Sequence, residues 1–157
     1  MSRRDQIRMN DEELRAYIDG AQTIIINTIG PDGVPHPMPM WFGVEDDGAI
    51  VMSTFTKSQK IRNLERDPRL SLLVESGEIY EQLRGVVIYG KGELVREVEA
   101  ITDILVRVNS RSVDGAKDAS AENVRAAVAV TAPKRTGIRI RPEKLVSWDH
   151  TKLGGVY

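Results

Sequence analysis

Residues 53–68 read STFTKSQKIRNLERDP, and this stretch decides how the chain is interpreted. Hydroxyl side chains precede a short basic helix, which Asp67-Pro68 ends because proline disfavours helical geometry in the residue before it. Free backbone N–H groups at a helix start, with hydroxyls around them and a lysine one turn in, are typical of a phosphate-binding site. A capped helix on the solvated surface is the alternative, and the stretch alone leaves both interpretations open.

The composition limits the classes of function. The chain has 157 residues, enough for one domain with a buried core. Lys and Arg number 22 against 23 Asp and Glu, and the net charge of −1 argues against a general nucleic-acid-binding protein. The absence of cysteine excludes disulfides, thiolate metal ligands and a cysteine nucleophile. The two histidines, His36 and His150, are far apart, so we predict no metal site.

The sequence also bears on location. No apolar run approaches the ~20 residues of a membrane span. The first residues, MSRRDQIRMNDEE, are basic but lack the apolar segment that follows in a secretory signal. We therefore expect a cytoplasmic protein that binds neither a membrane nor nucleic acid.

Turn and capping signals divide the chain into short elements. Asn10 and Glu13 form a capping box for a helix that ends at Gly20. Turn residues at 31–33 and 46–48 separate three extended segments, the first two of which make a hairpin. Further strands are predicted over residues 69–76 and 83–97, helices over 98–113 and 121–132, and a last extended segment over 136–148.

This order of elements predicts the fold class. About six strands arrive as hairpins with turn signals ~8–12 residues apart, and two helices are inserted late. Alternating strand–helix units are absent from the pattern. We therefore predict a mainly β protein, an antiparallel barrel with peripheral helices, in a single domain over residues 1–157.

The order and spacing of these blocks resemble the flavin/deazaflavin oxidoreductase superfamily, the split β-barrel proteins related to pyridoxamine 5′-phosphate oxidase. The blocks are the capped first helix, TIGPDGVPHPMPMWF (28–42), STFTKSQKIRNLERDPRLSLLVE (53–75) and LRGVVIYGKGELV (83–95). The resemblance implies a homodimeric split barrel whose cofactor ring lies in a groove between subunits. A half-open barrel with exposed strand edges favours a two-fold dimer on physical grounds as well.

The resemblance also implies the cofactor. Pyridoxamine-phosphate oxidases place a serine, an arginine and a lysine on the flavin phosphate. Ser58 and Lys60 match this pattern, but Gln59 stands where the arginine is expected and offers neither charge nor a bidentate fork. The LERDP ending and the length look more like the branch that uses the deazaflavin coenzyme F-420, whose oligoglutamate tail is anionic. We therefore expect F-420, with FMN as the alternative.

Five residues of the basic stretch are assigned to the phosphate and the tail by this resemblance. Ser58 and the adjacent backbone N–H groups would bind phosphate, and Lys60 would pair with its charge. Gln59 would add a neutral hydrogen bond, and Lys57 and Arg62 would supply charge for an anionic tail.

Five further residues are assigned to the ring. Ser53 and Thr54 would meet its polar edge. Met38 and Met40, on one face of their strand, would form an adaptable apolar floor, with Trp41 on the other face. A purely structural role in the core is the alternative for these last three residues.

The predicted function is that of an oxidoreductase. We expect reduced F-420 to transfer hydride to an unsaturated small molecule, and we name no catalytic residue because such a cofactor carries the chemistry itself. The alternatives are an FMN-dependent oxidase or reductase, a non-catalytic flavin- or deazaflavin-binding protein, and a structural dimer without cofactor. The sequence carries no readable code for the substrate.

Overall fold

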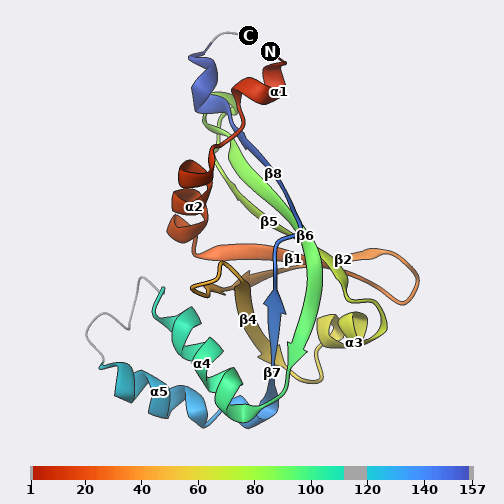
Figure 1. The fold of residues 1–157 in the computed structure, drawn as a ribbon. Helices are drawn as coiled ribbons and strands as arrows, with labels where there is room; N and C mark the ends of the chain where they lie inside the picture. The colour runs from red at the N-terminus through yellow and green to blue at the C-terminus, as the bar shows by residue number, and fades with distance from the viewer. Residues whose placement is uncertain (1, 112–119, 156–157) are drawn as a thin grey trace.

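The computed structural model describes residues 2–111 and 120–155. Its strands form one curled sheet with helices around it (Figure 1). The strands in the described part of the chain are β1 (Thr23–Ile29), β2 (Pro35–Trp41), β3 (Gly43–Val44), β4 (Ile50–Phe55), β5 (Arg69–Ser76), β6 (Arg84–Val95), β7 (Arg135–Ile140) and β8 (Lys144–Asp149). The helices are α1 (Arg3–Gln6), α2 (Asp11–Gly20), α3 (Gln59–Arg66), α4 (Val98–Asn109) and α5 (Ala121–Ala129), with short 3₁₀ turns η1 (Tyr80–Gln82), η2 (Ala132–Lys134) and η3 (His150–Leu153).

Every strand pair is antiparallel, in the order β2-β1-β5-β6-β7-β4-β3, and β8 also pairs with β6. The long strand β6 joins two parts of the sheet, because its first half pairs with β8 and its last residues pair with β7. Gly90 lies between these halves, where a Cβ atom would come within 2.9 Å of the Arg141 carbonyl oxygen. Glycine at this position therefore lets the neighbouring chain approach closely as the sheet curls.

Two buried clusters stabilise the fold by removing apolar side chains from water. The first fills the inside of the curled sheet and includes Ile24, Ile26 and Met52. The second lies between β4 and α4, where Val51 packs with Ile104 and its neighbours. Strand β4 contributes to both clusters because its successive side chains point to opposite faces.

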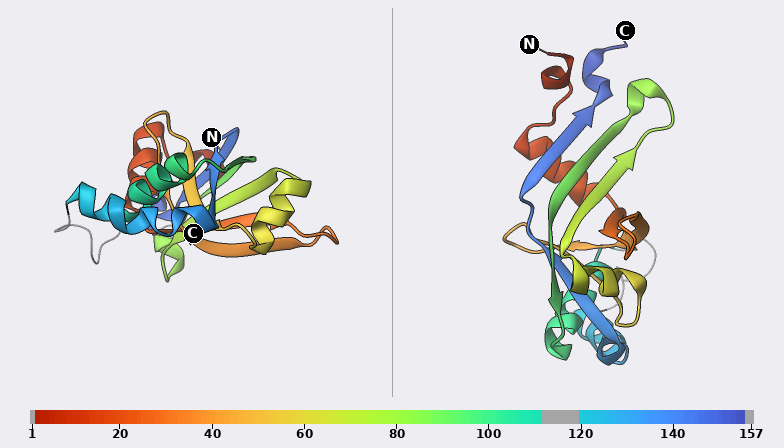
Figure 2. Two further views of the ribbon diagram at one scale, coloured as in Figure 1. Left: turned by 90° about the horizontal axis from the view of Figure 1, so that it is seen from below. Right: turned by 90° about the vertical axis from the view of Figure 1, so that its right-hand side faces the viewer.

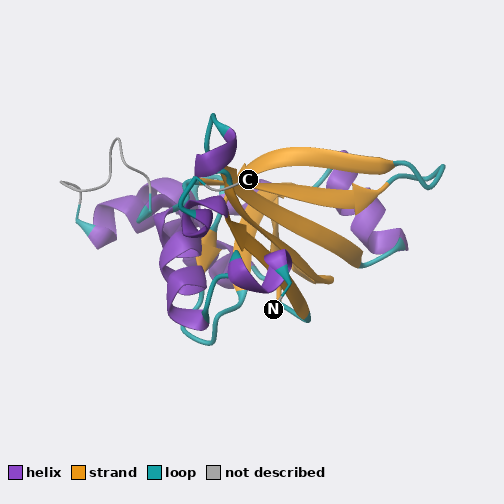
Figure 3. Cartoon of the chain, turned by 90° about the horizontal axis from the view of Figure 1, so that it is seen from above, coloured by secondary structure: helices purple, strands orange, loops and turns teal. Residues whose placement is uncertain are grey.

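The helices lie on different sides of the sheet. Helix α3 contacts β1 and β6, whereas α4 packs on β4 and β7 from the other side (Figures 1 and 3). The two ends of the chain lie side by side (Figure 2), where the Asp149 N–H donates to the Ile7 carbonyl oxygen at 2.7 Å. None of the helices within residues 2–111 and 120–155 is long and apolar enough to cross a membrane.

The predicted mainly antiparallel barrel with peripheral helices is confirmed. The capping box at Asn10 is also present, and Ser120 caps α5. The single extended segment predicted over residues 136–148 is wrong, because it forms two strands: β7 pairs with β4 and β6, and β8 pairs with the first half of β6. Helix α4 ends at Asn109, and the predicted end at Val113 lies outside the described residues.

Candidate functional site

The candidate site begins where β4 leads into α3. Ser58 has the extended geometry of an N-cap residue, but its hydroxyl makes no capping hydrogen bond. Its Oγ instead accepts a long hydrogen bond of 3.5 Å from the Thr54 hydroxyl. The hydroxyl of Ser58 and the first N–H groups of α3 thus remain available to an anion at the start of the helix.

Lys60 is the central residue of this site. It is only 7% exposed, and its Nζ donates to Thr54 Oγ1 at 3.2 Å. No carboxylate in the described part of the chain forms an ion pair with it, and burial lowers the pKa of its ammonium group. A buried cation without a counter-charge is energetically unfavourable unless a bound anion supplies one. The residues present therefore fit a phosphate group.

A hydrogen-bond network fastens α3 to β1 behind Lys60. Asn63 is fully buried and donates through Nδ2 to Thr28 Oγ1 at 3.0 Å. Its Oδ1 accepts a hydrogen bond of 2.9 Å from Gln59 Nε2, and Arg66 donates to the Ile29 carbonyl oxygen. The Gln59 amide is therefore engaged along the helix. Asn63 was not among the predicted site residues, although a polar residue three positions after Lys60 was a usable signal.

The two predicted ring contacts on β4 point in different directions. Thr54 shares the inner face with Met52 and reaches Lys60. Ser53 is on the other face, with Val51 and the α4 cluster, and its Oγ is buried without a hydrogen-bond partner. The structure thus brings Thr54, Ser58 and Lys60 together but places the Ser53 hydroxyl apart from them.

The predicted residues of β2 also lie on both faces. Met40 pairs with Ile24 and Met38 with Ile26, so both methionines are on the inner face. Met40 packs against the core, as in its structural interpretation, whereas Met38 is 37% exposed. Trp41 is on the outer face and 54% exposed.

Cations without ion pairs gather around the end of β4. Lys57 and Arg62 are exposed, and like Lys60 they form no ion pair with the described residues. Lys134 and Arg135, which were not among the predicted site residues, also form no ion pair with the described residues. They come near the end of β4 because β7 pairs with β4, a contact between segments about 80 residues apart.

One protein family matches most of the chain. The family model of pyridoxamine 5′-phosphate oxidase matches residues 10–149. The chain belongs to this family. Its members bind flavins or deazaflavins, and the matched range includes the β4–α3 site. No curated protein matches the sequence.

Solved structures of the same fold extend the comparison. A conserved hypothetical protein from Mycobacterium tuberculosis is 39% identical, with a TM-score of 0.87 over 100% of this chain and 95% of that chain. An F-420 reductase is 20% identical, with a TM-score of 0.62 over 83% of this chain and 94% of that one. The heme storage protein of Vibrio cholerae is 17% identical, with a TM-score of 0.66 over 87% and 94%. The last two share the fold with this family member.

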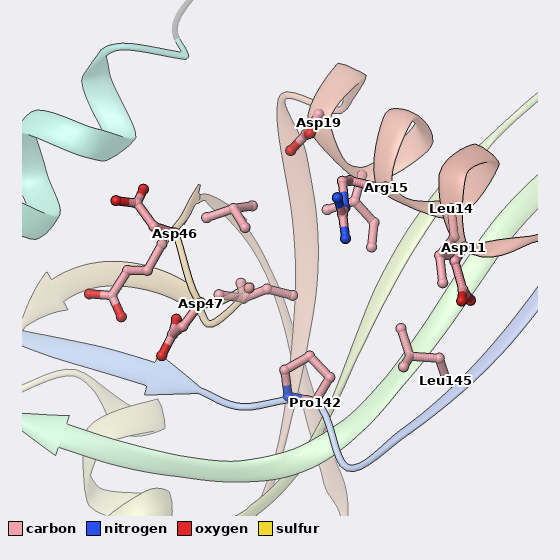
Figure 4. Close-up of a pocket in the computed structure, with 13 residues that line it drawn as sticks. Asp11, Leu14, Arg15, Asp19, Asp46, Asp47, Pro142 and Leu145 are labelled. Atoms are coloured by element: carbon pink, nitrogen blue, oxygen red, sulfur yellow. The ribbon is translucent and has the colours of Figure 1, made fainter.

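A separate hollow of about 570 Å³ lies between α2 and the turn that joins β3 to β4 (Figure 4). Its rim carries carboxylates such as Asp19, Asp46 and Asp47, with Arg15 beside them. Asp19, Asp46 and Asp47 each form an ion pair with an arginine. None of the ten predicted cofactor-binding residues lines this hollow. No group of side chains suited to hold a metal ion occurs within the described ranges.

Proposed function

We propose that this protein is a cytoplasmic, homodimeric oxidoreductase that uses reduced F-420 to transfer hydride to an unsaturated small molecule. The observation that carries the proposal is Lys60, a buried ammonium group without a counter-charge at the start of α3. Membership of a flavin- and deazaflavin-binding family supports a cofactor phosphate as the missing anion.

Each residue of the site has a role that follows from its position. Lys60 would pair with the phosphate, while Thr54 holds the lysine in place from β4. The Ser58 hydroxyl and the first N–H groups of α3 would donate to the phosphate oxygens. Met38, exposed on the inner face of β2, would offer an apolar surface to the ring. The cofactor, when bound, supplies the hydride chemistry.

Two observations favour F-420 over FMN. Gln59 replaces the arginine expected beside a flavin phosphate, and its amide is hydrogen-bonded to Asn63. Lys57, Arg62 and Lys134 provide exposed charge suited to a polyanionic tail. FMN, which carries one phosphate and no tail, would leave these cations unused.

The outer face of the sheet supports the homodimer. A continuous apolar row crosses five strands, because Pro39, Ile25, Leu73, Val87 and Val146 are successive register partners. None of the five belongs to either buried cluster. Pro39 is exposed and the other four are partly exposed, and an apolar row of this kind is suited to a self-complementary interface. Light scattering at micromolar concentration should give twice the chain mass of 17.5 kDa, and a monomer would contradict this part of the proposal.

Binding measurements test the cofactor. We expect purified protein to bind F-420, measured by fluorescence quenching, with a much lower Kd than FMN. Riboflavin, which lacks the phosphate, should bind weakly. Tight binding of FMN without binding of F-420 would refute the F-420 assignment in favour of the flavin alternative.

Turnover separates an enzyme from a binding protein. Reduced F-420 should be oxidised when the protein is mixed with a member of a panel of enones, quinones and tetrapyrroles. Binding of F-420 without oxidation by any member of the panel would instead favour a non-catalytic carrier.

A further inference from the structure

A second group of unpartnered polar atoms lies on the face of the β4–β7 pair opposite to Lys60. Arg135 is the register partner of Phe55, and Gly137 is the partner of Ser53. Paired residues of an antiparallel ladder point to the same side, so the side chains of Ser53, Phe55 and Arg135 are neighbours. This side faces α4, which packs on β4 and β7 (Figure 1). Thr54 lies on the other side, because successive side chains of a strand alternate.

Arg135 is held in place but uses none of its donors. Its guanidinium carbon lies 4.7 Å from the centre of the Phe55 ring, a stacking contact that restrains the side chain. Arg135 Nε and Ser53 Oγ are both buried, and neither has a hydrogen-bond partner among the described residues. Buried polar atoms nearly always have a partner, and these two unpartnered atoms belong to diagonal positions of the same ladder, which indicates a missing group.

The surroundings of Arg135 favour an anionic partner. No carboxylate in residues 2–111 and 120–155 pairs with it. By contrast, Arg139 in β7 and Arg141 just after β7 both pair with carboxylates. The local backbone is fixed, because Thr56 Oγ1 lies 3.0 Å from Thr136 Oγ1 and donates to the Lys134 carbonyl oxygen. Phe55 is 58% exposed, so a flat apolar group can reach its ring beside the guanidinium.

We propose that Arg135 and Ser53 form a second anion-binding site, which accepts a carboxylate or phosphate group whose flat or apolar neighbour lies against Phe55. The guanidinium would donate through Nε and one terminal nitrogen, and the Ser53 hydroxyl would donate a third hydrogen bond. The anion has two possible sources. A tail carboxylate of a cofactor held by Lys60 would pass Lys57 and Lys134 at the end of the ladder, whereas an anionic substrate would arrive directly. Only the first source rests on the proposed function.

The site is tested without any cofactor by titration with inorganic phosphate. The Nε–H resonance of Arg135, assigned by its loss in Arg135→Lys, should shift and saturate in the wild type and equally in Lys60→Met. Arg135→Ala should weaken the phosphate affinity of this site about tenfold or more. Arg135→Lys should retain only part of it, because lysine lacks the bidentate fork. Arg4→Ala removes the same charge from α1 at the far end of the molecule and should change nothing.

An Nε–H resonance that does not move with phosphate would overturn the proposal. The same result follows if Arg135→Ala and Arg4→Ala bind phosphate alike. Unchanged backbone spectra of the variants exclude misfolding as the cause. Failure of F-420 and FMN to bind the wild type would refute the proposed function and leave this titration valid.

Binding of two forms of F-420 to Arg135→Ala identifies the source of the anion. Loss of affinity in Arg135→Ala for F-420 with several glutamates, but not for the form without glutamates, assigns the site to the tail. If Arg135→Ala binds both forms as tightly as the wild type but has a raised KM for a substrate that carries a carboxylate, the site belongs to the substrate.

Discussion

Charges are arranged in opposite ways at two regions of the barrel. On the β3–β7 side, Arg139 forms a bidentate ion pair with Glu45 at 2.8 and 3.0 Å, and Arg107 pairs with Asp46 at 3.2 Å. Around the start of α3, Lys60 is more deeply buried than any of these groups and has no carboxylate partner in the described structure. The first region satisfies its charges within the chain, and the second leaves them for a ligand.

This difference separates stability from binding. A paired charge in a partly buried position contributes to stability through its hydrogen bonds. An unpaired buried charge lowers stability in the free protein, and its partner must come from outside. Variants at the two regions should therefore have opposite effects on folding and on ligand affinity.

The largest effect is expected at Lys60. Lys60→Met removes the cation but keeps an unbranched side chain of similar length, so the affinity for F-420 or FMN should fall about 100-fold, equivalent to ~2.7 kcal/mol. Equilibrium fluorescence titration measures the change. Lys91→Met, which removes an exposed lysine without an ion pair on β6, serves as the control and should bind normally. Equal affinities of the two variants would show that Lys60 does not meet the phosphate.

Arg139 should behave in the opposite way. Arg139→Met leaves Glu45 without its bidentate partner, and both side chains are only about one-fifth exposed. The free energy of unfolding should fall by about 1–2 kcal/mol, with cofactor affinity unchanged. Arg141→Met is the matched control. The Arg141 side chain is 61% exposed, so losing its ion pairs should change stability by less than about 0.5 kcal/mol. Urea unfolding of both variants tests the contrast, and similar losses would contradict it.

The sequence was sufficient to predict most of the fold and to propose one part of the candidate site. Turn residues such as those at 31–33 act locally, so hairpins, caps and the β4–α3 connection could be placed without a structure. Lys60 and Ser58 could be proposed for the same reason, since they belong to one contiguous stretch. Arg135 was missed because its position depends on the pairing of β7 with β4, which no local pattern specifies.

Burial was the other quantity that sequence could not provide. Neither the 7% exposure of Lys60 nor the orphan hydroxyl of Ser53 follows from residue type or spacing. Both depend on how α3 packs on β1 and β6 and how α4 packs on β4, a consequence of the complete tertiary packing. Ser53 and Thr54, adjacent in sequence, were therefore assigned one shared role that their opposite faces separate.

The buried lysine also predicts a pH dependence. Burial lowers the pKa of Lys60 in the folded protein below the 10.5 of an ordinary lysine. Between the folded and the unfolded pKa, the folded protein therefore binds fewer protons than the unfolded chain. Wild-type stability should therefore rise as the pH increases through this window, until lysine is neutral in both states. Lys60→Met should lack this rise and should be more stable than the wild type by about 1 kcal/mol at pH 7. Urea unfolding between neutral pH and 10.5 measures both effects, with Lys91→Met again as the reference. A less stable Lys60→Met at pH 7 would contradict the view that this charge is unfavourable in the free protein.

The smallest effect is expected at Lys57, and its salt dependence sharpens the comparison. Lys57 is exposed, so its attraction to an anionic ligand acts through water and is screened by ions. Lys57→Ala should weaken F-420 binding about twofold at low salt, and this difference should disappear near ~0.5 M salt. The defect of Lys60→Met should persist at the same salt concentration, because a buried pair is screened much less. Titrations of both variants at two salt concentrations distinguish the cases. If both defects vanish together, the ligand is held by the general field of the basic stretch; if only the Lys57 defect vanishes, a direct contact with buried Lys60 holds the phosphate.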